Sequence, residues 1–210
     1  MTIQVETIVC GPLENNVYVV FDDVTRYALV VDPSIGTEKV STFINKNDLD
    51  VQQILITHAH FDHFYGVPYL LKQFSNIKAV LLHEQDHAQW QSGGGARKYI
   101  GVRLQVEAPL RFITNGEEVN FGEHSCEIRL APGHSAGSVL YYFAELKSAF
   151  VGDVIFFHSI GRTDLEDGSA DQLQDSIQRQ VFTLPDETVL YPGHGPSTTV
   201  LEEKTNNPFF

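Results

Sequence analysis

The segment from Thr57 to His63 concentrates side chains that bind metal ions. His58, His60 and His63 lie together with Asp62 in this stretch, directly after the apolar run 51–56. Imidazole and carboxylate groups are ligands that divalent zinc and iron accept readily. Because a strand that ends in a loop can present several ligands to one point, the segment predicts a metal site.

Three further candidate ligands each follow a glycine at the end of an apolar run; they are His134, Asp153 and His194. Glycine is expected where the backbone turns sharply or approaches another segment closely. Alone, each histidine would more often be a surface or core residue, and Asp153 could equally serve a turn or a helix cap. Together with the cluster at 57–63, they favour one metal centre at the edge of a sandwich, where strand ends converge.

The number of candidate ligands exceeds the needs of one ion. A catalytic zinc uses about three protein ligands and keeps a position for water. Seven ligands suit two divalent ions that share a carboxylate, and ions about 3.5 to 4 Å apart can share a hydroxide. Zinc is the expected metal, and iron or manganese would accept the same ligands. The candidate ligands are His58, His60, Asp62, His63, His134, Asp153 and His194.

Strand-like patterns dominate both halves of the sequence. We expect strands over 3–9, 17–21, 27–31, 51–57, 78–83, 119–121, 125–130, 138–143, 150–153 and 188–191. Helices are expected over 37–47, from His63 to about Leu71, over 84–91 and over 170–182. The triplet Gly93–Gly95 predicts an exposed loop beside the site. The pattern predicts an α/β sandwich of two sheets covered by helices, in a single domain spanning residues 1–210.

The composition is that of an acidic globular chain. A net charge of -13, with only 14 Lys and Arg, argues against a nucleic-acid surface. No basic amphipathic stretch indicates a membrane surface, and no run reaches the ~18 to 20 apolar residues of a membrane span. Residues 1–6 lack the features of a secretory signal, so the expected location is the cytoplasm. Cys10 and Cys126 are too few for a disulfide framework and are interpreted as small core residues. The sequence does not indicate an oligomeric state.

The ordered set of ligand motifs resembles the metallo-beta-lactamase superfamily, and the match runs from Gly11 to the C-terminus. The resemblance implies a four-layer αββα fold, in which two mixed β-sheets are flanked by helices. It also implies how the ligands divide: His58, His60 and His134 would hold the first metal, Asp62, His63 and His194 the second, and Asp153 would bridge them. Asp62 would also orient the nucleophile, so Asp62 and Asp153 are the expected catalytic residues.

Shorter motifs are similar to the hydroxyacylglutathione hydrolase group, also called glyoxalase II. They lie at 11–18, 32–33, 132–138, 161–165, 192–196 and 202–208. The likeness is to the short, single-domain members, and it implies a hydrolase that cleaves a small thioester. A metal-bridging hydroxide would attack the thioester carbonyl, and the metals would stabilise the oxyanion and receive the thiolate. The context of Ser135 is interpreted as that of a metal ligand rather than of a serine nucleophile.

Other activities remain open on the same residues. Persulfide dioxygenases share this fold and use a single iron held by two histidines and one aspartate, here matched by His58, His134 and Asp153. A lactonase or another hydrolase of the same fold is a second alternative. A non-catalytic metal-binding protein is a third, disfavoured because every ligand position is filled. The glyoxalase-like motifs and the missing secretory signal disfavour β-lactamase activity.

Several residues near the predicted ligands have two interpretations. Asp32 and Thr57 either hydrogen-bond the ligating imidazoles or belong to an ordinary turn. Arg162 and Asp164 either shape the edge of the metal site or form a local ion pair. The aromatic residues that either line the substrate mouth or belong to the core are Trp90, Tyr99 and Phe157.

The remaining histidines are expected outside the metal centre. His83 and His87 have four-residue spacing, but a further metal site there is not expected. His124 and His158 are interpreted as surface or loop residues, although His158 is near enough to Asp153 in sequence for a substrate contact.

Overall fold

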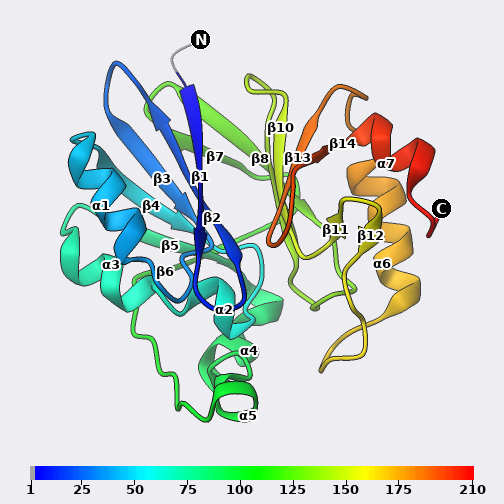
Figure 1. Ribbon diagram of the computed structural model, residues 1–210, viewed down its shortest axis with the longest axis horizontal. Coiled ribbons are helices and arrows are strands. Elements are labelled where there is room, and N and C mark those ends of the chain that lie inside the picture. The colour runs from blue at the N-terminus through cyan, green and yellow to red at the C-terminus, as the bar shows by residue number, and fades with distance from the viewer. Residues whose placement is uncertain (1–2) are drawn as a thin grey trace.

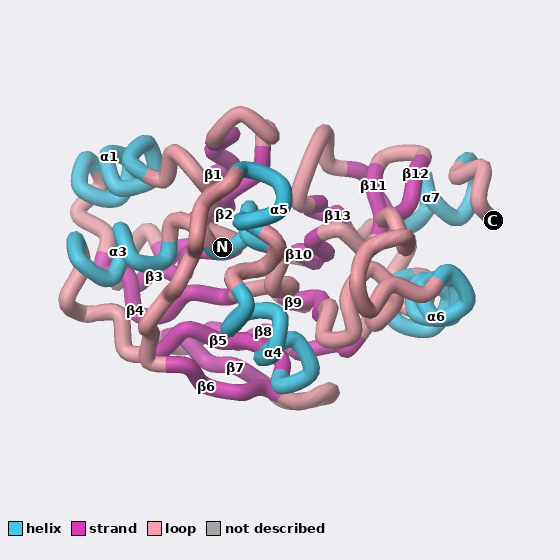
Figure 2. Tube along the Cα trace, turned by 90° about the horizontal axis from the view of Figure 1, so that it is seen from below, coloured by secondary structure: helices cyan, strands magenta, loops and turns pink. Residues whose placement is uncertain are grey.

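The computed structural model describes residues 3–210 as two facing β-sheets with helices on their outer sides (Figures 1 and 2). The first sheet has the order β1 (Ile3–Cys10), β2 (Asn15–Asp22), β3 (Tyr27–Val31), β4 (Asp50–Leu55), β5 (Ala79–His83) and β6 (Leu110–Ile113). The second has the order β14 (Thr198–Thr199), β13 (Val189–Pro192), β10 (Ser148–Gly152), β9 (Val139–Phe143), β8 (His124–Leu130) and β7 (Glu118–Phe121). A separate ribbon pairs β11 (Ile155–Phe156) with β12 (Ser159–Ile160).

Both sheets are mixed, as the resemblance implies. Strands β1 to β3 pair antiparallel, whereas β3 to β6 pair parallel. In the second sheet, β10 and β13 are parallel and the other pairs are antiparallel. The predicted αββα sandwich is therefore confirmed.

Helices cover the outer face of each sheet (Figure 1). The first sheet is covered by α1 (Glu38–Lys46) and α3 (Val67–Gln73), and the second by α6 (Ala170–Ser176), its π-helical extension Ile177–Val181, and α7 (Val200–Asn206). Three short helices, α2 (Phe61–Phe64), α4 (His87–Ser92) and α5 (Ala96–Ile100), lie together at one end of the molecule. Within residues 3–210, no helix has the length and apolar character needed to cross a membrane.

Strand β2 shows how the sequence builds the layers. Successive side chains point to opposite faces of a strand. Val17 and Val19 pack in the core beneath α1 and α3, whereas Tyr18 and Val20 pack in the core between the sheets. Because both faces are covered, the strand is a continuous apolar run rather than an alternating one.

The main departures from the predicted elements have local causes. The helix expected from His63 to Leu71 begins earlier, at Phe61, and is divided into α2 and α3. The division falls at Gly66, where a Cβ would collide with the Thr37 side chain and the Ser34 carbonyl. Pro68 lies in the first turn of α3, where a missing N–H is tolerated. The elements with no predicted counterpart are β6, α5, β11, β12, β14 and α7, all of them short.

Candidate metal centre

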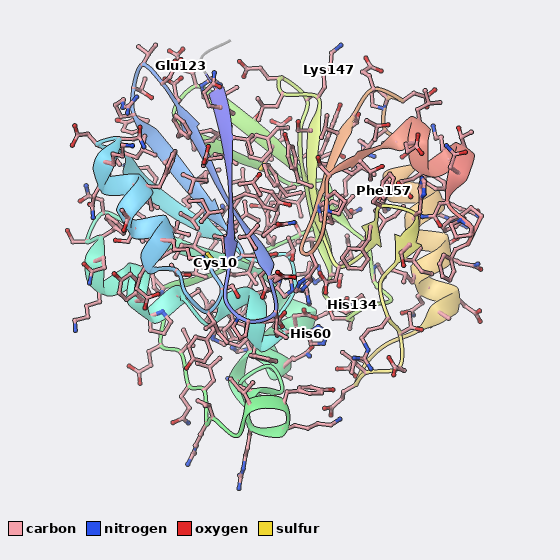
Figure 3. The ribbon with its side chains drawn as sticks, in the orientation of Figure 1. Cys10, His60, Glu123, His134, Lys147 and Phe157 are labelled. Atoms are coloured by element: carbon pink, nitrogen blue, oxygen red, sulfur yellow. The ribbon has the colours of Figure 1, made fainter. Side chains whose placement is uncertain are left out.

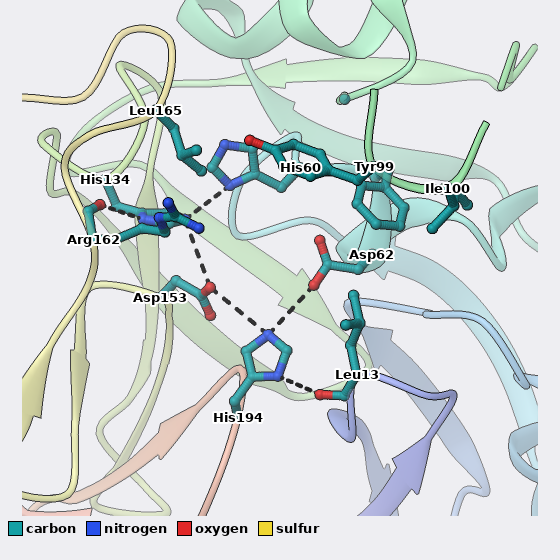
Figure 4. A pocket seen from close by; sticks show the side chains of 12 residues that line it. Leu13, His60, Asp62, Tyr99, Ile100, His134, Asp153, Arg162, Leu165 and His194 are labelled. Carbon is teal, nitrogen blue, oxygen red and sulfur yellow. Dashed lines mark hydrogen bonds and ion pairs between the residues drawn. The ribbon is translucent and has the colours of Figure 1, made fainter. Parts of the chain in front are cut away.

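The seven candidate ligands lie at one end of the sandwich, where four strands from the two sheets end. Figure 3 labels His60 and His134 there, and Figure 4 shows five of the seven from close by. The cluster at 58–63 follows β4, and His134, Asp153 and His194 follow β8, β10 and β13. Five of the seven line a cleft of about 530 Å³, and the other two, His58 and His63, are buried beneath it. The fold thus brings together residues that are far apart in the sequence, and their role as ligands stays a prediction.

The first group of ligands consists of three imidazoles. His58, His60 and His134 each bring one nitrogen to within 4.8 Å of the others. His134 Nε2 lies 2.8 Å from His60 Nδ1 and 3.2 Å from His58 Nε2. Three nitrogens at such spacing match one face of a tetrahedral metal site.

The second group combines a carboxylate with two imidazoles. Asp62 Oδ2 lies 3.5 Å from His63 Nε2 and 3.4 Å from His194 Nε2. Asp153 lies between the two groups: its Oδ2 is 3.6 Å from His134 Nε2 and 3.8 Å from His194 Nε2, and its Oδ1 is 3.5 Å from His63 Nε2. A carboxylate in this position can offer oxygen to both groups.

Hydrogen bonds at the outer ring nitrogens fix the tautomers of two ligands. His134 Nδ1 donates to the Arg162 carbonyl oxygen at 2.9 Å, and His194 Nδ1 donates to the Leu13 carbonyl oxygen at 3.0 Å (Figure 4). A carbonyl oxygen only accepts, so each Nδ1 carries the proton. In the neutral ring, Nε2 then presents a lone pair to the centre, which is the form that binds a metal.

The Asp32 carboxylate orients two more ligands. Its Oδ2 accepts from His63 Nδ1 at 2.9 Å and from the Thr57 hydroxyl at 2.6 Å. Because that hydroxyl donates to Asp32, it accepts from His58 Nδ1, 3.1 Å away. In the neutral rings, the Nε2 atoms of His58 and His63 are then inward lone pairs, and of the two interpretations of Asp32 and Thr57, the geometry supports orientation of the imidazoles.

Unpartnered polar atoms indicate that a cation fits this centre. His63 Nε2 and Asp153 Oδ1 are buried without a hydrogen-bond partner in residues 3–210. Lone pairs of several imidazoles that point at one another cannot hydrogen-bond mutually, and buried polar atoms are normally satisfied. Divalent cations would satisfy both requirements, so the donor set fits the metals that the sequence predicts.

The electrostatics of the centre separate the two groups. Burial and the surrounding imidazoles lower the pKa of His58, and they lower that of His60 to about 3, so both rings are neutral. Burial alone would lower the pKa of His63 as well, but the carboxylates of Asp153, Asp62 and Asp32 raise it well above its ordinary value. Positive charge is thus favoured among the carboxylates, where a cation would lie.

Close packing explains two of the glycines next to the ligands. A Cβ at Gly193 would collide with Asp153 Oδ1 and His63 Cε1, and a Cβ at Gly152 would collide with the Thr57 hydroxyl. Gly152 also has a φ of +50°. A side chain at Gly193 would displace two candidate ligands, and one at Gly152 would displace the hydroxyl that contacts His58.

Asp86 is a structural residue of the site that sequence reasoning missed. Its carboxylate accepts from Ala59 N at 2.7 Å, from Gly137 N at 2.6 Å and from Ser135 Oγ at 2.8 Å. It therefore ties the loop that carries His58 to the loop that carries His134. Residues 133–137 also match the Gly-x-Ser-x-Gly pattern of serine hydrolases, but the Ser135 hydroxyl is fully buried and bound to Asp86, so it cannot act as a nucleophile.

Asn15 is a second residue of the site that was not predicted individually, because the sequence indicates only its membership of a motif. Its Nδ2 donates to Asp62 Oδ2 at 2.8 Å and lies 3.3 Å from His194 Nε2. Only the folding of β2 against the end of β13 brings it there. It fixes the orientation of a ligand carboxylate.

The predicted loop at Gly93–Gly95 is beside the site, but its predicted exposure is wrong. Gly93 and Gly94 are buried, and the Gly94 carbonyl accepts from Phe61 N at 3.0 Å. A Cβ at Gly94 would collide with Phe61 N and with the Ala59 carbonyl. The segment is therefore packed against the ligand loop, because glycine allows the two backbones to approach.

Both interpretations of the 162–164 turn apply. Arg162 lines the cleft and its carbonyl holds His134, while its guanidinium pairs with Asp164 at 2.7 Å. Of the three aromatic residues, Tyr99 lines the cleft, Trp90 is buried in the core, and Phe157 lies away from the cleft (Figure 3).

The two remaining histidine predictions have different outcomes. The interpretation of His124 as a surface or loop residue is wrong, because it lies in β8, is 8% exposed and is bound between Asp22 and Glu145. His158 lies in the turn of the β11–β12 ribbon, pairs with Glu202 at 2.7 Å and does not line the cleft. A substrate contact by His158 is therefore not supported.

Comparison with known proteins identifies the family. A family model described as the metallo-beta-lactamase superfamily matches residues 10–194. The chain is 35% identical to a probable metallo-hydrolase of Bacillus subtilis, YqgX, over 95% of this chain and 93% of that protein. It is 32% identical to the hydroxyacylglutathione hydrolase GloC of Haemophilus influenzae, over 98% and 97%. It is also 30% identical to the mitochondrial persulfide dioxygenase ETHE1 of Mus musculus, over 91% and 69%.

Solved structures agree with this assignment. The B3 metallo-beta-lactamase BLEG-1 superposes with a TM-score of 0.93 at 34% identity, covering 98% of this chain and 99% of that one. The protein TTHA1623, solved in a di-iron-bound form, superposes with a TM-score of 0.87 at 33% identity, covering 98% and 100%. The chain therefore belongs to the metallo-beta-lactamase superfamily, as a metal-dependent hydrolase with the αββα fold.

Proposed function

We propose that the protein is a dinuclear-metal thioester hydrolase of the hydroxyacylglutathione hydrolase type. The observation that carries the proposal is the position of Asp153 between two groups of ligands on the floor of an open cleft. One ion would need only one of these groups. When bound, divalent cations supply Lewis acidity, which acidifies water and stabilises negative charge on a carbonyl oxygen. Zinc and iron are both candidates, and the di-iron form of TTHA1623 supports two ions.

Asp62 is the residue that we assign to orienting the attacking water. Burial alone would raise its pKa, but His63 and His194, with the hydrogen bond from Asn15, hold that pKa well below its ordinary value. The carboxylate therefore stays ionised and can only accept hydrogen bonds. Since it lines the cleft, it can accept one from a water beside a bound substrate.

The cleft suits a small acyl thioester. Its volume of about 530 Å³ lies within the range of small-molecule sites. Figure 4 shows Tyr99 and Ile100 on one side of the ligands and Arg162 and Leu165 on the other. Tyr99, Ile100 and Leu165 provide apolar surface above a charged floor, which can hold an acyl chain while the carbonyl meets the metal centre.

Persulfide oxygenation is the second candidate function. It is supported by the likeness to ETHE1 and by the convergence of His58, His134 and Asp153, the residues that a single iron would need. Asp62, His63 and His194 also converge on this centre, although that iron would not need them. Their presence favours hydrolysis.

A pair of double variants tests the proposal. Wild-type protein loaded with zinc or iron should hydrolyse S-lactoylglutathione, and the His58→Ala/His60→Ala variant should lose at least about a thousandfold in kcat/KM, because the first group then lacks two ligands. His87→Ala/His158→Ala removes two histidines outside the cleft and should retain activity. Hydrolysis of a lactone and oxygen uptake with glutathione persulfide are measured in parallel.

Two results would reject thioester hydrolysis. One is full activity in the His58→Ala/His60→Ala variant, which would place the chemistry elsewhere. The other is oxygen uptake with persulfide by a protein that leaves thioesters intact, which would establish the dioxygenase instead.

A further inference from the structure

The loop 93–104 is a compact unit fastened to the metal centre. At its start, the Gly94 carbonyl accepts a hydrogen bond from the amide of Phe61, which directly follows the ligand His60. At its base, Gly93 packs against the Leu104 carbonyl so closely that a Cβ would collide with it. Between these points the chain forms α5. The loop therefore holds a fixed position relative to the ligands.

Tyr99 places this loop at the mouth of the cleft. Its ring stacks on that of Phe61 with centroids 6.2 Å apart, and both residues line the cleft. Lys98 Nζ lies 5.2 Å from the centre of the Tyr99 ring. The ammonium group of Lys98 helps to lower the pKa of the Asp164 carboxyl, so the loop faces the 162–164 turn. Figure 1 shows α5 at the same end of the molecule as α2.

Three cations of this loop have no acidic partner. Arg97, Lys98 and Arg103, which we call the basic rim, are exposed, and within residues 3–210 none of them forms an ion pair or a side-chain hydrogen bond. The nearby Arg162 is already paired with Asp164. The rim therefore gives the loop, whose Tyr99 and Ile100 line the cleft, three exposed cations that no ion pair holds.

The rim is unusual in a chain of net charge -13. Three like charges within seven residues repel one another, and acidic groups more than about 10 Å away are screened by salt. The other cations without partners in the described part of the chain, Lys46, Lys72 and Lys78, lie in α1, in α3 and directly before β5, and do not line the cleft. Clustered positive charge is thus carried by the loop that contributes Tyr99 and Ile100 to the lining of the cleft.

We propose that the basic rim binds the anionic end of the thiol carrier, so that the substrate is a thioester of a carrier with carboxylates or phosphates. This inference rests on the proposed thioester hydrolysis. The acyl carbonyl would lie on the metal centre, the carrier would extend past Tyr99, and its charged groups would reach Arg97, Lys98 and Arg103. The rim is a specificity determinant, and it takes no part in bond cleavage.

The test compares charged and neutral carriers in two variants of equal charge. The rim variant carries Arg97→Gln, Lys98→Gln and Arg103→Gln; the control variant carries Lys46→Gln, Lys72→Gln and Lys78→Gln. For each metal-loaded protein, kcat/KM is measured on S-lactoylglutathione, S-lactoyl-coenzyme A and the neutral S-lactoyl-N-acetylcysteamine. The first two substrates distinguish carboxylate from phosphate recognition.

The rim variant should lose about tenfold in the ratio of kcat/KM for the preferred anionic thioester to that for the neutral one, chiefly through KM. The loss should diminish as salt is added, because the charges are exposed. The control variant should keep the ratio within about twofold. An unchanged ratio in the rim variant, or an equal fall in both variants, overturns the inference.

Binding of S-methylglutathione separates this inference from the proposed function. This thioether cannot be hydrolysed, and calorimetry reports its affinity for metal-loaded protein whether or not thioesters are cleaved. If wild type cleaves no thioester, the proposed function fails, and weaker binding of S-methylglutathione by the rim variant than by the control still supports the rim. Binding of coenzyme A is measured in the same way for phosphate recognition, and equal binding of both ligands by the two variants rejects the inference.

Discussion

The Asp32 carboxylate acts on both groups of ligands through short hydrogen bonds. It accepts directly from His63 and, through the Thr57 hydroxyl, determines the proton position on His58. Groups that orient a ligating imidazole typically change metal affinity by about 10- to 100-fold when they are removed. The site therefore depends on residues that touch no metal.

Variants of Thr57 test the two hydrogen bonds that connect His58 through the Thr57 hydroxyl to Asp32, which we call the relay. Thr57→Val keeps the shape but removes the hydroxyl, so His58 loses its partner, and metal affinity should fall by about 10- to 100-fold. Thr57→Ser keeps the hydroxyl and should bind metal nearly as tightly as wild type. Competition with a chelator measures both constants. Equal affinities in the Val and Ser variants would show that the relay does not matter.

Among single residues, the candidate ligands could be predicted from the sequence, but the residues that hold them in place could not. Each candidate ligand stands at a strand end in a recognisable motif, so its position in the sequence indicates its place in the fold. Asp86 has no such signal, because its partners Ala59, Ser135 and Gly137 reach it only after two distant loops have folded together. Asp22 and Glu145, the carboxylates that contact His124, could not be predicted for the same reason.

Among the elements, the loop 93–104 links the metal centre to the cleft mouth. Gly94 has a φ of +59° and lies against the Phe61 amide and the Ala59 carbonyl, so a side chain there would push on the ligand loop. Gly101 has a similar φ of +69°, but a Cβ there would meet nothing within 4 Å. A side chain at Gly101 would therefore cause backbone strain alone, whereas a side chain at Gly94 would cause strain and also displace the ligand loop.

Alanine substitutions use this difference. Gly101→Ala should lower the free energy of unfolding by about 1–2 kcal/mol and leave metal affinity intact. Gly94→Ala should cost more stability and should also weaken metal binding and thioester hydrolysis, because the Phe61 and Ala59 backbone must move. Denaturant unfolding and metal titration measure both. If Gly94→Ala binds metal as Gly101→Ala does, the loop does not position the ligands.

Elements with continuous apolar runs were predictable, and the short exposed ones were not. Strands such as β2 and β10 are buried on both faces, and their composition shows this. The ribbon β11–β12 has two residues in each strand, and α5 has no buried face beyond Ala96, so neither produces a periodic pattern. Yet these short segments border the 162–164 turn and the cleft, which is where a substrate would be recognised.

Across the whole molecule, polar contacts join the two sheets at both ends. The metal centre occupies one end. Glu123, next to His124, lies at the opposite end from His60 and His134 (Figure 3). There His124 Nε2 of β8 lies 2.7 Å from Asp22 Oδ2 of β2, and its Nδ1 lies 2.7 Å from Glu145 Oε2. Burial opposes a charge on His124, but hydrogen bonds with the two carboxylates outweigh it and raise its pKa.

A raised pKa in the folded state gives this contact a defined pH dependence. His124 should contribute its full stability below the pKa of the unfolded chain, about 6.5, and lose it as the pH rises through the higher folded value. The difference in unfolding free energy between wild type and His124→Gln should therefore be larger at about pH 6 than at about pH 9. Urea denaturation measures it, and His87→Gln is the control. A difference that grows with pH would contradict the assignment.

The number of metal ions needed for activity tests the proposed function most directly. Metal-free protein is titrated with zinc or ferrous iron, and the bound metal per chain and the rate of S-lactoylglutathione hydrolysis are recorded at each step. The two groups of ligands around Asp153 predict saturation at two ions, with hydrolysis appearing as the second ion binds. Saturation at one ion, or full hydrolysis with one ion bound, would contradict the dinuclear centre.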